Sequence, residues 1–186
     1  KLIKENLDTC HIPVILLTAQ TAIEHNLEGL RIGADDYITK PFNINILLSR
    51  CNNLVNNRIM LQEKFSKQPQ ATPQILATNI LDKAFIDQAM KIIEQHLDDT
   101  NFNVDIFARE MSIARTKLFN KLKDITGQTP YEFIITVRLK RAAFMLKNNP
   151  ELNISEIADH LGFSSPRQFT KSFKAKFHVI PQVYRK

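Results

Sequence analysis

The sequence predicts a mainly α-helical protein in which two similar helical units follow a partial α/β segment. The pattern between Val104 and Phe133 returns between Ile154 and Tyr184, with one extra residue in the second turn. Residues 1–63 instead alternate short apolar runs with amphipathic stretches, which is typical of a parallel α/β layer. Residues 1–63 carry a net charge of −1 and residues 64–186 a net charge of +7. A surface that binds a polyanion is therefore expected in the second part.

Strand, helix, strand and helix are expected in turn within residues 1–63. The apolar run Pro13–Ala19 predicts a buried parallel strand. Thr21 can cap the next helix, which ends at Gly33 and buries apolar side chains from Ala22, Ile23, Leu27, Leu30 and Ile32. A brief strand over Asp36–Thr39 follows, and Asn43 begins a helix that reaches about Leu61. Two strands are too few for a complete sheet that is covered on both faces, so we expect residues 1–63 to form only part of a domain.

Residues 64–81 read as a linker, because they mix Gln, Thr and Ser with two prolines. An amphipathic helix is expected over Asp82–Leu97, and residues 98–101 form a turn. Its inward side chains are Phe85, Ile86, Ala89, Ile92 and Ile93. The predicted domains are therefore 1–63, the linker 64–81, and 82–186.

The first copy of the repeated pattern predicts a short helix, a tight turn and a second helix, over about 104–127. In its second helix the inward side chains are Leu118, Leu122 and Ile125, and Phe119 lies at the boundary. The outward ones are Arg115, Thr116, Asn120 and Lys123. A long helix, about 131–148, joins this unit to the second.

The second copy, about 154–177, has clear start and stop signals. Ser155 can cap its first helix and Gly162 can end it. Ser165 and Pro166 then suit the cap and first position of the next helix. That helix directs Phe169, Phe173 and Phe177 inward, and its outward side chains are Arg167, Thr170, Lys171 and Lys174.

A short helix, a tight turn and a second helix with a basic outer face are the helix-turn-helix arrangement, whose second helix enters a DNA major groove. Any amphipathic helix has a solvated polar face, so one copy alone would be weak support. Two copies on a common spacer favour consecutive segments of the major groove. The candidate DNA-binding residues are Arg115, Thr116, Lys117, Asn120, Lys121, Lys123, Ser165, Arg167, Gln168, Thr170, Lys171 and Lys174.

The segment IADHLGFSSPRQFTKSFKAKFHVIPQVYRK resembles the C-terminal signature of AraC/XylS-type transcription regulators. The resemblance covers about residues 82–186 and implies two helix-turn-helix units bridged by a long helix. It implies that the base-reading residues are Thr116, Asn120, Arg167 and Lys171. The chain departs from the family pattern at Ser112, Gln168 and His178. These departures bear on local turn geometry.

The GADDYI and KPF motifs in residues 1–63 resemble the second half of a receiver domain of flavodoxin-like fold. The resemblance implies that Thr18 and Lys40 contact an aspartyl phosphate, that Tyr37 is the switch aromatic, and that Lys40-Pro41 is a cis peptide. The phosphoacceptor aspartate belongs to an earlier strand that this chain lacks, and Asp35 and Asp36 cannot replace it. We therefore expect no phosphorylation of this chain, and Mg²⁺ only in an intact receiver domain.

A partial receiver followed by an AraC-type domain resembles the C-terminus of a response regulator. The stretches LDTCHIPVILLTA and ITGQTPYEFI are more similar to hybrid two-component sensors, which fuse sensor kinase, receiver and DNA-binding domain. The expected function is sequence-specific transcription regulation, with double-stranded DNA as partner, a homodimer, and RNA polymerase as a further partner. The alternative is an interaction module whose partial receiver mediates self-association.

An enzyme is not expected, because the five histidines are scattered and no catalytic set or phosphate-cradling glycine loop is in register. No metal site is expected, and no cofactor. Cys10 and Cys51 lack metal-ligand spacing, so free thiols in a reducing cytoplasm are expected. No run has the length of a membrane span, although the full-length protein could be anchored in the inner membrane.

Overall fold

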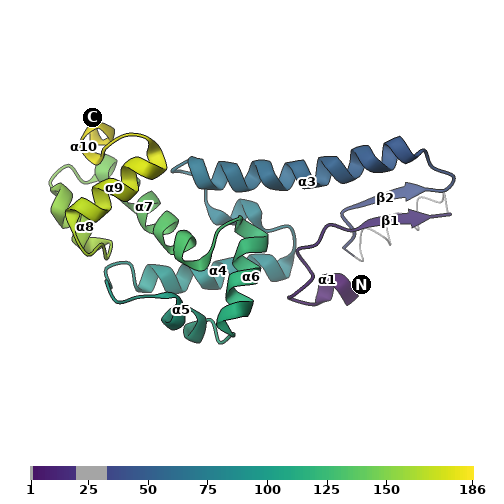
Figure 1. Cartoon of the computed structure of the whole chain (residues 1–186), viewed down its shortest axis with the longest axis horizontal. Coiled ribbons are helices and arrows are strands. Elements are labelled where there is room, and N and C mark those ends of the chain that lie inside the picture. The colour runs from purple at the N-terminus through teal and green to yellow at the C-terminus, as the bar shows by residue number, and fades with distance from the viewer. Residues whose placement is uncertain (1, 20–32) are drawn as a thin grey trace.

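One long helix joins a small strand pair to a larger helical body in the computed structural model, which describes residues 2–19 and 33–186 (Figure 1). The elements in chain order are α1 Leu2–Glu5, β1 Ile15–Thr18, β2 Asp36–Thr39, α3 Ile44–Lys67, the 3-10 helix η1 Pro73–Leu76, α4 Ile80–Gln95, α5 Val104–Glu110, α6 Arg115–Thr126, α7 Pro130–Asn148, α8 Ile154–His160, α9 Pro166–Phe177 and α10 Pro181–Arg185. The mainly helical fold predicted from the sequence is confirmed.

The two predicted strands are present and parallel. β1 and β2 pair in register from Ile15 opposite Asp36 to Thr18 opposite Thr39. The Lys40-Pro41 peptide that follows β2 is cis, as the receiver resemblance implies. The predicted helix that begins at Thr21 and carries Ala22, Ile23, Leu27, Leu30 and Ile32 falls on 20–32, outside the described residues.

Helix α3 connects the strand pair with the helical body. Asn43 caps it as predicted, since its side chain accepts a hydrogen bond from the amide of Asn45. The helix does not stop near Leu61 but continues to Lys67. Its last turns carry Phe65, which is fully buried with its ring centroid 5.9 Å from that of Phe133. Helix α3 therefore continues past Leu61 because its end packs into the helical core.

The segment after α3 packs on the helical body instead of running free. Lys140 of α7 donates hydrogen bonds to the carbonyl oxygens of Gln68 and Ala71. Pro73 and Leu76 of η1 are buried. Part of the predicted linker is therefore integral to the core of the helical body.

Two apolar cores are built around α7, one for each copy of the repeat. Phe133, Ile134 and Val137 of α7 join the first core, whose other buried members are Phe65, Leu76, Phe85, Ile86, Ala89, Ile92, Ile93, Phe102, Phe107, Ala108, Met111, Leu118, Leu122 and Ile125. The next turns of α7 join the second core, formed by Leu139, Ala142, Ala143, Leu146, Ile157, Ala158, Leu161, Phe163, Phe169 and Phe173. One rigid helix thus contributes to both cores.

The start of helix α7 is defined by strong capping residues. Thr129 and Glu132 form a reciprocal capping box, and Pro130 occupies the first helical turn. The predicted long helix over about 131–148 is confirmed as Pro130–Asn148. Among the described residues, no helix is both long enough and apolar enough to cross a bilayer.

The turns of both units require unusual backbone conformations. Ser112 has φ 56° and His178 φ 63°, although neither is glycine, and both are positions where the chain departs from the AraC/XylS pattern. Gly162, which follows the C-cap of α8, has φ 62°. A Cβ at this position would lie 2.8 Å from the carbonyl oxygen of Leu97. Glycine at 162 is therefore required by both conformation and space.

The predicted start of α8 is wrong by two residues. Asn153, not Ser155, is the cap, and it forms a capping box with Glu156. Ser155 instead lies inside the first turn and is exposed. The predicted cap of α9 is confirmed, because Ser165 Oγ accepts a hydrogen bond from the amide of Gln168.

Candidate nucleic-acid interface

The outer face of α9 is exposed and basic. Phe169 and Phe173 are fully buried on the opposite side and anchor the helix to the second core. Arg167, Lys171 and Lys174 are all exposed. This helix therefore presents three cations to solvent from a fixed backbone.

Two other predicted residues of α9 take part in the turn before it. Gln168 Oε1 accepts hydrogen bonds from the backbone amide and the hydroxyl of Ser164, at 3.1 and 2.7 Å. Ser165 caps the helix, and Thr170 is half-buried. Gln168 and Ser165 thus hold the first turn of α9 in place, and their contact with DNA stays a prediction.

Helix α6 presents the corresponding face of the first unit. Thr116, Asn120 and Lys123 are exposed, and Arg115 pairs with Asp105 at 2.9 Å across the surface. Phe119, for which the sequence left both orientations open, is 44% exposed. The contact of these side chains with bases stays a prediction.

The prediction that Lys121 lies on the DNA-binding surface is wrong. Lys121 is only 3% exposed, and its Nζ lies 2.7 Å from Oδ1 of the fully buried Asp82. It also donates to Cys10 Sγ at 3.1 Å. A cation in the interior requires such partners, since an unpaired buried charge is very costly. Lys121 is therefore a structural residue.

Lys117 is partly covered as well. Its Nζ lies 2.9 Å from Asp8 Oδ1, in the segment that precedes β1. The side chains of both residues are exposed, so Lys117 can exchange Asp8 for another anion. No sequence pattern pointed to Asp8, because it lies in a different predicted domain.

A buried arginine fixes the second unit to the rest of the helical body. Arg138 of α7 donates hydrogen bonds to the carbonyl oxygens of Gly162, His96 and Asp99, at 2.9, 3.1 and 2.6 Å. Burial lowers the pKa of its guanidinium. The turn between α8 and α9 is thus tied to α7 and to the loop after α4, which limits rotation of α9. Sequence reasoning missed Arg138 because its partners are all backbone atoms.

Two of the three residues expected to form the phosphate switch, Thr18 and Lys40, lie at the carboxyl end of the strand pair. Thr18 ends β1 and Lys40 follows β2, and the Lys40 amide donates to the Thr18 carbonyl oxygen at 2.7 Å. Tyr37 lies within β2 and is half-buried. The carboxyl ends of parallel strands meet at this edge. The phosphate-binding roles of these residues stay predictions.

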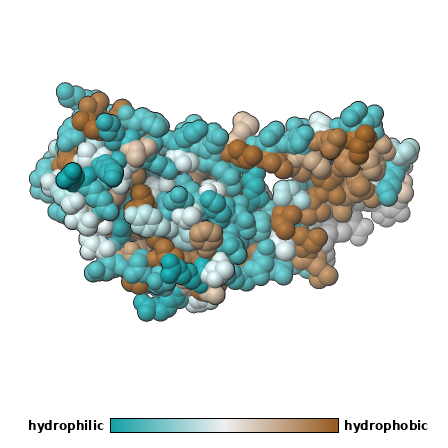
Figure 2. All heavy atoms as spheres, viewed as in Figure 1, coloured by the Kyte–Doolittle hydropathy of each residue, from teal (hydrophilic) through white to brown (hydrophobic). Residues whose placement is uncertain are grey.

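The surface of the strand-pair end is rich in apolar side chains, which Figure 2 shows as a brown area over β1, β2 and the first turns of α3. The exposed large apolar residues of this part are Leu2, Ile3, Ile12, Leu17, Ile44, Ile46, Leu48, Val55, Ile59 and Met60. A contiguous apolar surface of this kind marks a contact with another segment or chain. It agrees with the expectation that the strand pair is part of a larger domain.

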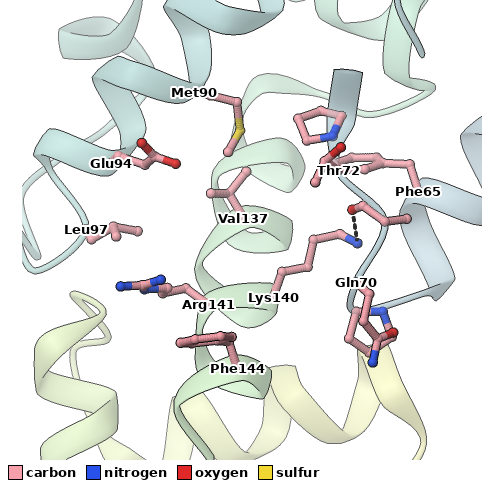
Figure 3. A pocket seen from close by; sticks show the side chains of 13 residues that line it. Phe65, Gln70, Thr72, Met90, Glu94, Leu97, Val137, Lys140, Arg141 and Phe144 are labelled. Carbon is pink, nitrogen blue, oxygen red and sulfur yellow. Dashed lines mark hydrogen bonds between the residues drawn. The ribbon is translucent and has the colours of Figure 1, made fainter. Parts of the chain in front are cut away.

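A concavity with a volume of about 650 Å³ lies between α4, α7 and the segment after α3. Figure 3 shows Lys140 and Arg141 extending to opposite sides of α7, with Glu94 of α4 and Leu97, which follows α4, on the side of Arg141. Burial and the nearby cation of Lys176 lower the pKa of Lys140 to about 8. None of the predicted DNA-binding residues lines this pocket.

The helical body is similar in sequence and fold to known helix-turn-helix domains. Residues 107–186 match the family described as "Helix-turn-helix domain". The C-terminal domain of AraT, a response regulator from Geobacillus stearothermophilus, superposes with a TM-score of 0.50 at 25% identity, over 54% of this chain and 83% of that one. An AraC-type DNA-binding domain protein from Chromobacterium violaceum gives a TM-score of 0.52 at 23% identity, over 57% and 94%.

Residues 107–186 are an AraC-type helix-turn-helix domain. The AraC-type resemblance drawn from the sequence is therefore confirmed. The chain is also similar to histidine kinase P4 of Formosa agariphila, at 43% identity over 98% of this chain and 13% of that protein. The Msm operon regulatory protein of Streptococcus mutans is 33% identical, over 59% and 38%. The chain thus spans well under half the length of these relatives.

Proposed function

We propose that this chain is the DNA-binding output part of a two-component transcription regulator. The observation that carries the proposal is the pair of exposed basic helices, α6 and α9, each packed on the same helix α7. Thr116 and Asn120 of α6 would read base edges, as would Arg167 and Lys171 of α9, because amide and guanidinium groups match adenine and guanine in the major groove. Lys123 and Lys174 would contact phosphates.

The sequence-specific step rests on the rigidity of the support. The capped helix α7 contributes to both cores, and Arg138 ties the turn before α9 to it. Both reading helices are therefore held in a defined relation, so that little conformational entropy is lost when DNA binds. Operators with two major-groove segments on one face of the duplex suit this arrangement, at about 34 Å separation.

In the intact protein, phosphorylation of a receiver aspartate would draw in Thr18 and Lys40 and reposition Tyr37. The name of histidine kinase P4 supports a hybrid sensor, and the AraT title supports a response regulator. Receiver pairing would bring two AraC-type domains together, so that the second binding event becomes intramolecular. Homodimers and contact with RNA polymerase belong to this proposal.

A salt titration tests DNA binding directly. The wild-type chain should lose affinity for a duplex steeply as salt rises, because phosphate contacts release counterions. Replacing Arg167 and Lys171 together by Ala should remove sequence preference and weaken binding by at least about tenfold. The matched control replaces Lys83 and Lys91, two exposed lysines of α4, and so removes the same charge. Equal losses in both double variants would refute the assignment of α9.

A second candidate function, self-association through the partial receiver, is favoured by the apolar surface at the strand-pair end. Sedimentation of the chain at rising concentration measures it. Replacing Leu48 and Val55 of α3 by Ser should then abolish association without changing DNA affinity of the monomer. A chain that associates but does not bind DNA would favour this function over the first.

A further inference from the structure

Residues Leu7–His11, termed here the docked segment, lie against the AraC-type domain although they precede the strand pair. Leu7 packs on the first core, and Cys10 is fully buried. Figure 1 shows the chain between α1 and β1 passing beside α6. Residues far apart in the sequence thus meet at the flank of a helix proposed to read DNA.

Cys10 holds the docked segment through polar contacts in the interior. Its thiol lies 3.3 Å from Asp82 Oδ1 and 3.1 Å from Lys121 Nζ. Its carbonyl oxygen accepts a hydrogen bond from Asn79 Nδ2 at 3.0 Å. These contacts satisfy the polar atoms that docking removes from water. The docked segment therefore binds at a specific position against α4 and α6.

The neighbouring residues bring charge to the surface of α6. Asp8 pairs with Lys117 at 2.9 Å, and His11 Nε2 lies 3.3 Å from Asp124 Oδ2. Lys117, Lys121 and Asp124 form one stripe along α6, since they are spaced by four and three residues. The stripe of Thr116, Asn120 and Lys123 lies next to it on the same helix, and so the docked segment borders the surface proposed to read bases.

We infer that the 117–121–124 flank of α6 is the docking surface for the receiver part of this chain, and that docking restrains DNA binding by α6. The inference rests on the proposed function. Asp8 pairs with the ammonium of Lys117 and so competes with a phosphate for it, and the docked segment adds bulk beside the stripe proposed to read bases. A movement of the receiver part that withdraws the docked segment would return Lys117 to DNA. The receiver part is thereby coupled to DNA affinity without any dimer.

The first test compares two single-charge variants. Asp8→Asn removes the partner of Lys117, and Glu63→Gln removes an equal charge from an exposed pair on α3, with Lys67. Binding is measured on a mixed-sequence duplex of about 30 base pairs, roughly three helical turns. Asp8→Asn should bind about three- to tenfold more tightly than Glu63→Gln, with a steeper salt dependence by about one counterion. In a Lys117→Ala background the two variants should bind equally.

The second test reads the docking itself. In a Cys51→Ser background, Cys10 is the remaining thiol, and its buried position predicts slow labelling by a maleimide. Excess duplex should accelerate labelling of Cys10 by about tenfold or more, because DNA and the docked segment compete for Lys117 at the border between the two stripes of α6. Asp8→Asn should accelerate labelling without DNA.

The outcomes separate the two proposals. A chain that binds no duplex refutes the proposed function and this inference together. A chain that binds duplex while Asp8→Asn and Glu63→Gln have equal affinity refutes the inference alone. Labelling of Cys10 that stays unchanged when duplex is bound also refutes it, since docking and DNA binding would then be compatible.

Discussion

Lys121 and Asp82 form an ion pair in the interior, and each depends on the other. Lys121→Met should destabilise the protein by about 3–5 kcal/mol, because it leaves the carboxylate of Asp82 buried without its cation. Urea unfolding measures the free energy of unfolding. The exposed neighbour Lys123 is the control, since Lys123→Met should change it by less than about 0.5 kcal/mol.

Adding Asp82→Asn to Lys121→Met should recover part of the lost stability, since the unpaired charge is then gone. If Lys121→Met and Lys123→Met unfold at the same urea concentration, the buried pair does not contribute as described. Duplex binding by Lys121→Met shows whether Lys121 contacts DNA. Replacing a lysine that contacts a phosphate would weaken duplex binding.

The exposure of single residues on α6 was predictable only in part. The period of 3.6 residues placed Leu118, Leu122 and Ile125 inward, and all three are fully buried. Lys121 lies beside that stripe, where a lysine is normally solvated, and the periodicity gave no reason to bury it. Its burial depends on Asp82 and Cys10, which come from other elements.

At the scale of the element, α8 tests which residue begins a helix. Asn153→Ala should destabilise the protein by about 1 kcal/mol, because the capping box with Glu156 is lost. Ser155→Ala is the matched control and should cost less than about 0.5 kcal/mol, since Ser155 is exposed within the helix. Thermal unfolding followed by circular dichroism gives both values. A larger effect at Ser155 would show that the helix begins two residues later.

The elements themselves were largely predictable from local signals. Asn43, and Ser165 with Pro166, mark predicted helix starts that the structure confirms. Helix α7 begins at Pro130, one residue before its expected start. Asn153 was missed because Ser155 is an equally good cap by residue type, and Glu156 three residues after Asn153 is the signal that separates them. The extension of α3 to Lys67 was missed because it depends on packing of Phe65 on Phe133.

At the scale of the whole molecule, the junction of α3, α4 and α7 predicts a pH dependence. Lys140 has a folded pKa of about 8 against an ordinary value of 10.5. Between these two pH values the unfolded chain binds more protons at Lys140 than the folded chain does. Stability from this residue therefore rises as pH increases from 8 to 10.5, by on the order of 1–2 kcal/mol after screening.

The comparison of wild type with Lys140→Met isolates this effect. The difference in unfolding free energy between the two proteins should change with pH over that window and stay constant below it. Lys91→Met, on the exposed side of α4, is the matched control for the loss of a lysine outside this junction. A constant difference for Lys140→Met would mean that Lys140 titrates as an exposed lysine does.

The sequence by itself determined the local structure of the AraC-type domain: the repeated unit, the long helix between its copies, and the basic outer faces. Such features follow from periodicity, caps and charge, which are local properties of the chain. Only the tertiary structure decided that Lys121 is buried, that Arg138 fixes the turn before α9, and that Asp8 pairs with Lys117. These contacts join elements distant in sequence, and no local pattern encodes which distant partner a polar group will meet.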